Sequence, residues 1–569
     1  MRGPGDRASK TTRPCAPTLS PQADGHDGDP INADWESSCT PGSKSSASAQ
    51  LPLAREPGDL GVASLCVVHT GLPREGQLPY AVDVRAEESD AGMVPMNSSK
   101  TWVTPVEARE GRAAAEGKSV ARNASPTQRG IDATTSLQRI GNRAKNKPKE
   151  QWTNLLSHIR VPLLEQAFHR LRRDAAPGVD AMTWETYGER LGERLRDLED
   201  RIHRGSYHPL PVRRVQIPKG LSETRPIGIA ALEDKLVQQA VRSVLEPIYE
   251  AQFVGFSYGF RPGRSPHDAL DALAGAIARK VNWVLDADIR SFFDTIDHGW
   301  MQRFFEHRIG DTRMVRLLMK WLRAGVMENG QRHESEQGTA QGGIISPLMA
   351  NVYLHYVFDL WAQSWRKTQA RGAVYLVRYA DDIVMGFQCE QDARAMYAAL
   401  TARLAKFGLT LHPDKSRVLR FGRFAAADRR ERGLGKPETF EFLGFTHIAS
   451  ESRGGKFQLK RRTSRKKRAA KQSSLAGEMR RRMHASVAEQ HEWLSRVLEG
   501  HYRYYGVPTN MRALSQFRRR VEEMWHRSLQ RRSQRAKWSD ATRRAHQARF
   551  SLPVPWIHHP WPDRRFDSR

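Results

Sequence analysis

Hydrophobic residues recur at helical spacing from about residue 135 onward. Near the start of this region they predict one helix capped by Thr153, one begun by Pro162, and one that follows Thr183 and continues to Leu195. A further helix is predicted over residues 232–245. Beyond residue 470 the pattern is almost wholly helical, so we expect the C-terminal part of the chain to consist of helices.

Runs of β-branched and aromatic residues lie between these predicted helices. They predict strands over residues 212–217, where Pro218 ends the strand, over 281–288 and over 409–412. Two more apolar runs flank Ala380-Asp381-Asp382, a pattern that predicts a hairpin with the acidic pair at its tip.

The first 95 residues differ in composition from the rest. They are rich in Pro, Gly, Ser and Ala and contain few apolar runs, so we expect a disordered N-terminal extension over 1–95 and a lead-in segment over 96–150. No stretch approaches the ~18 consecutive apolar residues of a membrane span. The N-terminus has no apolar core of a secretory signal, and the four cysteines form no Cys-x-x-Cys pair. We therefore expect a cytoplasmic protein without a membrane partner, a disulfide scaffold or a cysteine zinc site.

The formal charge of the 569 residues is +28 at pH 7 and is unevenly distributed. Residues 1–100 carry a net −4, residues 451–569 a net +20 and the middle of the chain +12. Such an excess indicates a polyanion partner, most simply a nucleic acid, although a high net charge can also serve only to keep a protein soluble.

Two acidic segments indicate metal chemistry. Asp288 ends one predicted strand, and Asp381-Asp382 lies between two others. Neighbouring aspartates between apolar strands are costly unless a cation neutralises them, and carboxylates with substrate phosphates suit Mg²⁺. Two such ions can activate a 3′-hydroxyl and stabilise a leaving pyrophosphate. A lone Asp-Asp pair would more often be an exposed turn, so the pair needs the support of its surroundings.

Those surroundings follow a recognisable order. Tyr379-Ala380-Asp381-Asp382, preceded by Asp288-Ile289-Arg290-Ser291-Phe292-Phe293-Asp294, resembles the two catalytic motifs of reverse transcriptases. Further blocks resemble this family in sequence order: Ala175–Asp180, Ile217-Pro218-Lys219 with Arg225–Gly228, Gly259–Gly263, Gly338–Pro347, Leu411–Lys415 and Glu441–Phe445. They cover roughly residues 130–450.

The resemblance implies an α+β fold of the right-hand polymerase type, with fingers and a palm sheet over 151–450, followed by a helical thumb over 451–535 and a short basic tail over 536–569. It implies that Asp288, Asp381 and Asp382 are catalytic and hold two Mg²⁺ ions with the Ile289 carbonyl, while Asp294 is structural. The implied nucleotide-binding residues are Lys219, Arg225, Phe293, Gln341 and Lys415. Phe293 would crowd a ribose 2′-hydroxyl. Ala340 stands where the family usually has Pro, a change that is expected to loosen the loop.

The C-terminal part indicates a branch of this family. The basic run 461–468, the segment Gly500-His501-Tyr502-Arg503-Tyr504-Tyr505-Gly506 and a later arginine-rich run resemble the thumb/maturase region of bacterial group II intron proteins. Cations that meet phosphates and rings that stack on bases suit RNA. The implied RNA-binding residues are Arg461, Arg462, Arg465, Lys466, Lys467, Arg468, Tyr502, Arg503, Tyr504, Tyr505, Arg531 and Arg532. No cysteine follows Cys389, so the HNH-type nuclease of many relatives is expected to be missing, and the tail is either a reduced DNA-binding segment or a simple basic end.

The expected partners are intron RNA, an RNA template with a DNA primer, and dNTPs. Whether the chain forms a homodimer is left open by the sequence. The leading hypothesis is an RNA-directed DNA polymerase that also assists splicing and mobility of its intron by target-primed reverse transcription. Two alternatives remain: an RNA-binding splicing factor with an idle polymerase, and a stand-alone or retron-like reverse transcriptase.

Charge reversals among residues 461–468 should weaken RNA binding and flatten its dependence on salt. With fewer protein–phosphate contacts, fewer counterions are released when the RNA binds. The logarithm of the dissociation constant, measured against the logarithm of salt concentration, checks this. An unchanged slope would refute the assignment.

Overall fold

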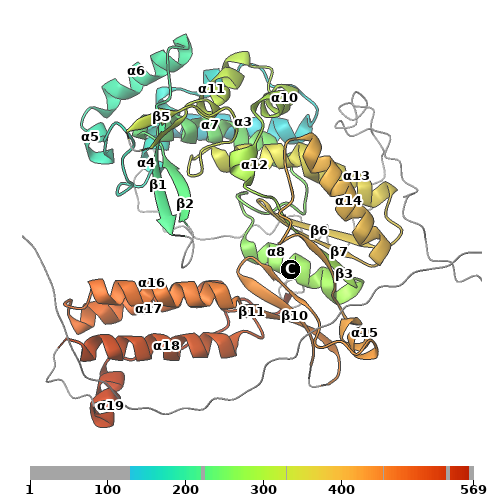
Figure 1. Ribbon diagram of the computed structural model, residues 1–569. Helices are drawn as coiled ribbons and strands as arrows, with labels where there is room; N and C mark the ends of the chain where they lie inside the picture. The colour runs from blue at the N-terminus through green and yellow to red at the C-terminus, as the bar shows by residue number, and fades with distance from the viewer. Residues whose placement is uncertain (1–127, 219–223, 329, 453, 533–538, 563–569) are drawn as a thin grey trace, which may run out of the picture. The chain divides into compact units, whose positions relative to one another are not determined.

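The computed structural model describes residues 128–218, 224–328, 330–452, 454–532 and 539–562. The predicted extension 1–95 and Lys219 lie outside these residues. Within them, helices and three small sheets form a mixed α and β architecture, which confirms the predicted mixture (Figure 1). None of the helices in this part of the chain is both long and apolar enough to cross a lipid bilayer.

The first helices follow the predicted pattern with two differences. They are α3 (Gln128–Asn146), the 3₁₀ helix η1 (Leu155–His158), α4 (Val161–Arg170), α5 (Trp184–Gly188) and α6 (Leu191–Arg204). Pro162 lies in the first turn of α4, and the Thr183 hydroxyl caps α5 by accepting from Thr186 N–H, both as predicted. The helix predicted to continue to Leu195 is two helices, and η1 begins after Asn154, which adopts a left-handed conformation that asparagine tolerates, rather than after Thr153.

The first sheet has the strand order β2-β1-β4-β5. Its strands are β1 (Val212–Pro218), β2 (Thr224–Ile229), β4 (Val326–Glu328) and β5 (Gln331–His333). β1 and β2 pair antiparallel, while β1 and β4 pair parallel. The strand predicted over 212–217 is thereby confirmed.

The second sheet carries the acidic segments. Its order is β6-β7-β3-β8, with all neighbours antiparallel, and its strands are β3 (Trp283–Asp288), β6 (Val374–Tyr379), β7 (Asp382–Phe387) and β8 (Arg417–Arg420). The predicted hairpin around Ala380 is confirmed. The strand predicted over 409–412 is wrong: the segment makes one bridge, from Leu411 to Ile289, and then turns back where Lys415 N–H donates to the His412 carbonyl.

Both faces of this sheet are covered. Strand alternation sends Leu285, Ile383 and Met385 into one core, shared with α14 (Glu390–Lys406), and Val284 and Val384 into a second core, shared with α8 (Pro266–Arg279). The remaining helices of the region are α7 (Leu232–Glu250), α9 (Phe292–Thr295), α10 (His298–Arg308), α11 (Thr312–Leu322), α12 (Ser346–Leu354), the π-helix η2 (His355–Asp359), α13 (Leu360–Thr368) and α15 (Ala425–Glu431).

The third sheet leads into the C-terminal helices. β9 (Thr439–Phe442), β10 (Phe445–Glu451) and β11 (Phe457–Thr463) are antiparallel, and Leu443 and Gly444, both left-handed, form the two-residue turn between β9 and β10. α16 (Arg465–Arg481), α17 (Val487–Tyr505) and α18 (Met511–Gln530) share a separate core around Leu498, Phe517 and Trp525. With α19 (Asp540–Arg549), they confirm that the part of the chain beyond 470 is mainly helical where the structure describes it.

A buried ion pair links β11 to α8. Arg461 Nη1 lies 2.7 Å from Asp271 Oδ1, and the side chains are 4% and 1% exposed. Removing one partner of such a pair leaves the other charge uncompensated in a poorly solvated place.

Asp271→Ala should therefore lower the free energy of unfolding by about 3 kcal/mol, measured by urea denaturation. The control is Asp174→Ala, which breaks the solvent-exposed pair with Arg172 and should leave the transition in place. Equal transitions for the two variants would show that the buried pair does not stabilise the fold.

Candidate active site

The site is built around three aspartates at neighbouring strand ends. Asp288 is the last residue of β3, and Asp382, the first residue of β7, lies directly opposite it in the antiparallel register. Opposed residues in such a pair point to the same face with their Cβ atoms about 5 Å apart. Asp381 lies in the turn before Asp382. The structure thus brings together the three residues predicted to be catalytic.

The hairpin tip depends on a close backbone approach. Ala380 has a φ of 57°, a left-handed conformation that is unfavourable for a residue with a side chain. The chain at Gly259 passes so near that a Cβ atom there would lie 2.3 Å from the Ala380 nitrogen. The glycine of the predicted Gly259–Gly263 block therefore allows a neighbouring segment to support the tip.

The clustering of carboxylates shifts their pKa values. Burial, followed by the charges of Asp381 and Asp288, raises the pKa of Asp382 to about 7, although its side chain retains contact with solvent. Burial and the Asp288 charge also raise the pKa of Asp381. Negative charge is therefore disfavoured at the strand ends unless a cation joins them.

A fourth carboxylate in the group was missed by the sequence predictions. Asp286 lies two residues before Asp288 on the same face of β3, and burial raises its pKa to about 7, with the Asp382 and Asp288 charges adding to the effect. The two-residue spacing within the predicted strand was the signal that could have identified it.

Cations surround the aspartates. Lys415 Nζ lies 2.7 Å from Asp288 Oδ2, and Ser416 Oγ accepts from Asp288 N–H at 3.1 Å. The charges of Lys467, at the start of α16, and Lys415 offset part of the rise in the pKa of Asp382, and the charge of Arg225 on β2 offsets part of the rise in the pKa of Asp381. Segments far apart in the sequence thus place positive charge beside the same acidic group.

The carboxylates suit a hard divalent cation by their chemistry. In the described part of the chain, no three His, Cys, Asp or Glu side chains are gathered closely enough to hold an ion by themselves. Mg²⁺ does not require such a cage, because it keeps several waters and binds through one or two carboxylates plus substrate phosphates. The carboxylate oxygens of Asp288, Asp381 and Asp382 suit that mode of binding, as does the carbonyl of Ile289, the buried residue that directly follows β3.

The predicted nucleotide-side residues lie on segments next to the sheet. Gly228 N–H on β2 donates to the Gln341 carbonyl at 2.6 Å, which joins two of the predicted blocks. Phe293 is half-buried and meets Phe292 edge-on, with ring centroids 5.5 Å apart. The Ala340 carbonyl accepts from Ser346 Oγ at 2.9 Å and from Gly343 N–H at 3.3 Å, both within the predicted Gly338–Pro347 block.

The predicted RNA-binding residues separate by exposure. Two of them are buried, which corrects the prediction for these positions: Arg461 pairs with Asp271, and the Tyr502 hydroxyl donates to the Pro553 carbonyl in the core of the C-terminal helices. Tyr504 is half-buried and bonded to the Leu443 carbonyl, with its ring stacked on Phe445. Tyr505, Arg468 and Arg532 are also half-buried.

The exposed residues are Arg462, Arg465, Lys466, Lys467, Arg503 and Arg531. The predicted effect of charge reversal on the salt dependence of RNA binding therefore concerns the first four of these, which lie within 461–468.

The part of the chain that holds the three aspartates matches known proteins in sequence. Residues 217–447 match the family model for reverse transcriptase (RNA-dependent DNA polymerase). The chain is 35% identical over 282 residues to Protein YkfC of Escherichia coli K12, covering 44% of this chain and 72% of that protein. It is 37% identical over 221 residues to the group II intron-encoded protein LtrA of Lactococcus lactis, covering 38% of this chain and 37% of LtrA. A nuclear intron maturase of Arabidopsis thaliana is 23% identical over 132 residues.

These matches, together with the paired aspartates, define the class of protein as a reverse transcriptase. More specifically, the chain belongs to the family of group II intron reverse transcriptases and maturases, and the resemblance found in the sequence is confirmed. The matched region spans little more than a third of LtrA.

Proposed function

We propose that this chain is an RNA-directed DNA polymerase that transfers dNMP from a dNTP to a primer 3′-hydroxyl on an RNA template. We also propose that it binds a group II intron RNA, assists its splicing and supports intron mobility by target-primed reverse transcription. The observation that carries the polymerase proposal is the opposition of Asp288 and Asp382 across β3 and β7, with Asp381 at the tip.

The proposed architecture is a right-hand polymerase. Fingers and palm occupy residues 151–450 with the β6-β7-β3-β8 sheet as the palm, α16 to α18 form the thumb/maturase domain within 451–535, and 536–569 form the tail. The separate core of α16, α17 and α18 supports the division, and the start of α16 carries Lys467, whose charge acts on Asp382.

Asp288, Asp381, Asp382 and the Ile289 carbonyl would hold two Mg²⁺ ions. When bound, these ions would lower the pKa of the primer hydroxyl and neutralise the charge that develops on the leaving pyrophosphate. The protein itself orients the carboxylates through the strand register, which places Asp288 opposite Asp382. Lys415, which is already paired with Asp288, would supply positive charge and a proton donor on the pyrophosphate side.

The incoming nucleotide would lie beside β2 and the Gly338–Pro347 loop. Arg225 would contact the triphosphate, Gln341 the nucleotide, and the ring of Phe293 would exclude a 2′-hydroxyl. The hydrogen bond from Gly228 to Gln341 supports this placement because it holds the two segments together. Lys219 has the same proposed role as Arg225 but lies outside the described residues.

RNA binding is proposed for the exposed cations at the start of α16 and for Arg503 and Arg531. The name of LtrA, a group II intron-encoded protein, supports an intron RNA as the partner. The buried Tyr502 would stabilise the C-terminal helices, and the half-buried Tyr504 would join α17 to the turn between β9 and β10, rather than stack on bases.

Asp381→Asn should reduce primer extension on an RNA template with Mg²⁺ and dNTPs by about a thousandfold or more, because the amide cannot neutralise the metal charge. RNA affinity should be unchanged. Asp294→Asn is the matched control, since this exposed carboxylate near Asp288 was predicted to be structural.

A wild-type protein that binds intron RNA and promotes splicing but extends no primer would instead establish the splicing factor with an idle polymerase. Extension without any preference for an intron RNA would favour the stand-alone reverse transcriptase.

A further inference from the structure

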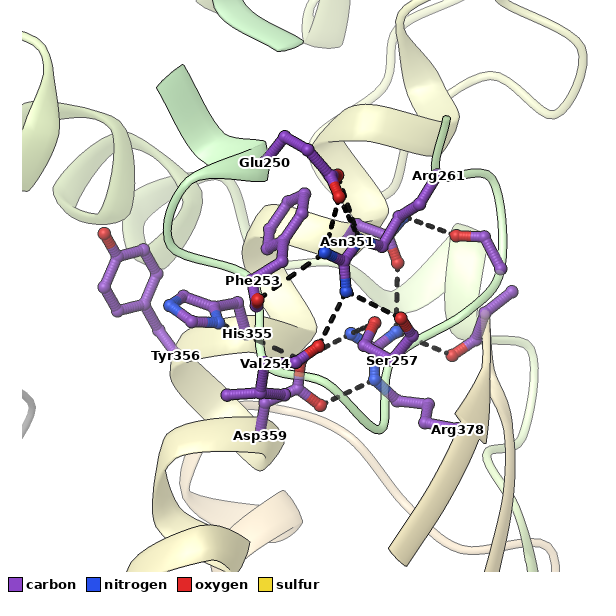
Figure 2. Close-up of polar contacts among 12 residues, drawn as sticks. Glu250, Phe253, Val254, Ser257, Arg261, Asn351, His355, Tyr356, Asp359 and Arg378 are labelled. Carbon is purple, nitrogen blue, oxygen red and sulfur yellow. Dashed lines mark hydrogen bonds and ion pairs between the residues drawn. The ribbon is translucent and has the colours of Figure 1, made fainter. Parts of the chain in front are cut away.

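A buried arginine lies directly behind the catalytic hairpin. Arg378 is the next-to-last residue of β6, and its side chain and that of Asp359 are both 0% exposed. Nε donates to Asp359 Oδ1 at 2.7 Å and Nη2 to Oδ2 at 2.5 Å, a two-pronged pairing that fixes the plane of the guanidinium (Figure 2).

The remaining donors of this guanidinium point to other segments. Nη1 donates to Asn351 Oδ1 and to the Ala380 carbonyl, both at 3.0 Å, and Nη2 donates to Ser257 Oγ at 2.7 Å. A guanidinium has five N–H groups, and here each has a partner. A single rigid group therefore connects β6, two helical segments and the 253–259 segment to the hairpin tip.

The bond to Ala380 lies on the peptide that leads into Asp381. Ala380 holds the left-handed conformation described above, which needs support from its surroundings. Further bonds position the supporting segment: Tyr258 N–H donates to the Arg378 carbonyl at 2.8 Å, and Asn351 Nδ2 donates to the Gly259 carbonyl at 2.7 Å. The direction of Asp381 is thus coupled to the buried network.

The π-helix η2 explains how two acceptors reach one arginine. Asn351 on α12 and Asp359 at the end of η2 are eight residues apart, which in a regular α-helix would rotate them by about 80° from each other. A π-turn inserts one extra residue, so the pair is spaced like residues seven apart and returns to one face. The irregular turn therefore has a specific geometric result.

Neighbouring groups keep the network intact. His355 Nδ1 lies 3.9 Å from Asp359, but burial lowers the pKa of His355 to about 4, so the histidine stays neutral near pH 7 and does not compete with Arg378 for the carboxylate. Arg261, also buried, pairs with Glu250 and donates to the carbonyls of Val254 and Ser257, which fixes the segment behind Arg378 (Figure 2).

Burying an ion pair is a poor way to gain stability, because desolvation offsets most of the attraction, whereas it can specify one conformation. We propose that Arg378, held by Asp359 and Asn351, is a positioning residue that locks the Ala380 peptide and so aims Asp381 for catalysis. This inference rests on the proposed polymerase function. Arg378 has no solvent-exposed surface and acts only through the hairpin.

The test compares Arg378→Lys with Arg308→Lys in the full-length protein. Lysine keeps the charge but cannot satisfy a carboxylate, an amide and a carbonyl with one planar fork. Arg308 is a matched control because it is 2% exposed and bonds to the main-chain carbonyls of Glu150 and Lys147, outside the network. The measurements are kcat, the KM for dNTP, primer–template affinity, thermal unfolding, and hydrogen exchange of the 380–382 amides without metal.

Arg378→Lys should lower kcat by about a hundredfold, the effect of a misplaced catalytic group, while KM and primer–template affinity change less than about twofold. The 380–382 amides should exchange about tenfold faster, which corresponds to the loss of one net hydrogen bond. Arg308→Lys should lower the unfolding temperature to a similar extent without either effect.

Wild-type exchange at 380–382 in Arg378→Lys, or a kcat no lower than that of Arg308→Lys, overturns the proposal. Exchange is read without substrate, so it decides the matter even if the wild type proves inactive and the polymerase proposal itself fails. If Arg378→Lys does not fold, Asn351→Ala replaces it: this neutral change removes one partner of Arg378 and should still speed exchange at 380–382 and lower kcat.

Discussion

Like charges held close together at strand ends are the constraint on which the rest of this structure depends. Asp288 and Asp382 face each other across a ladder, with Asp381 and Asp286 nearby, and burial together with the neighbouring carboxylates raises the pKa values of Asp286, Asp381 and Asp382. Such an arrangement persists only if the surrounding structure over-determines it. Two cores cover the two faces of the sheet and fix the register, while the guanidinium of Arg378 holds the tip from behind. The fold therefore supplies the stability that the site itself lacks.

Much of this could be predicted from the sequence because the relevant signals are local. Alternating apolar residues on either side of Ala380-Asp381-Asp382 define a hairpin whatever surrounds it, and Thr183 and Pro162 mark helix starts by chemistry that needs no tertiary partner. The order of the motifs along the chain then indicated the reverse transcriptase family. The predicted strand over 409–412 failed because the segment forms a single bridge, between Leu411 and Ile289, before the chain turns, and a short apolar run does not show how far its pairing will extend.

What could not be predicted depends on burial by distant segments. Arg461 lies in a basic run whose other members are mostly exposed, and only the proximity of Asp271, 190 residues earlier, makes it an internal ion pair. Tyr502 and Tyr504 carry the same aromatic signal as a base-stacking surface, yet they pack against Pro553 and Phe445. The partners of Arg378 come from residues 257, 351, 359 and 380, and the π-turn that aligns two of them has no sequence signature.

The placement of cations around the aspartates connects the charge distribution with the chemistry. Three cations from separate segments lie near the aspartates. Arg225 acts on Asp381, Lys467 acts on Asp382, and Lys415 pairs with Asp288. Without such neighbours, the raised pKa values would favour protonated carboxyls, which bind metal poorly. Even with these cations nearby, burial and the neighbouring carboxylates keep the pKa values of Asp381 and Asp382 raised. The cations of the protein thus offset the charge of the acidic group only in part, and carboxylates in such surroundings are of the kind that suits a hard divalent cation.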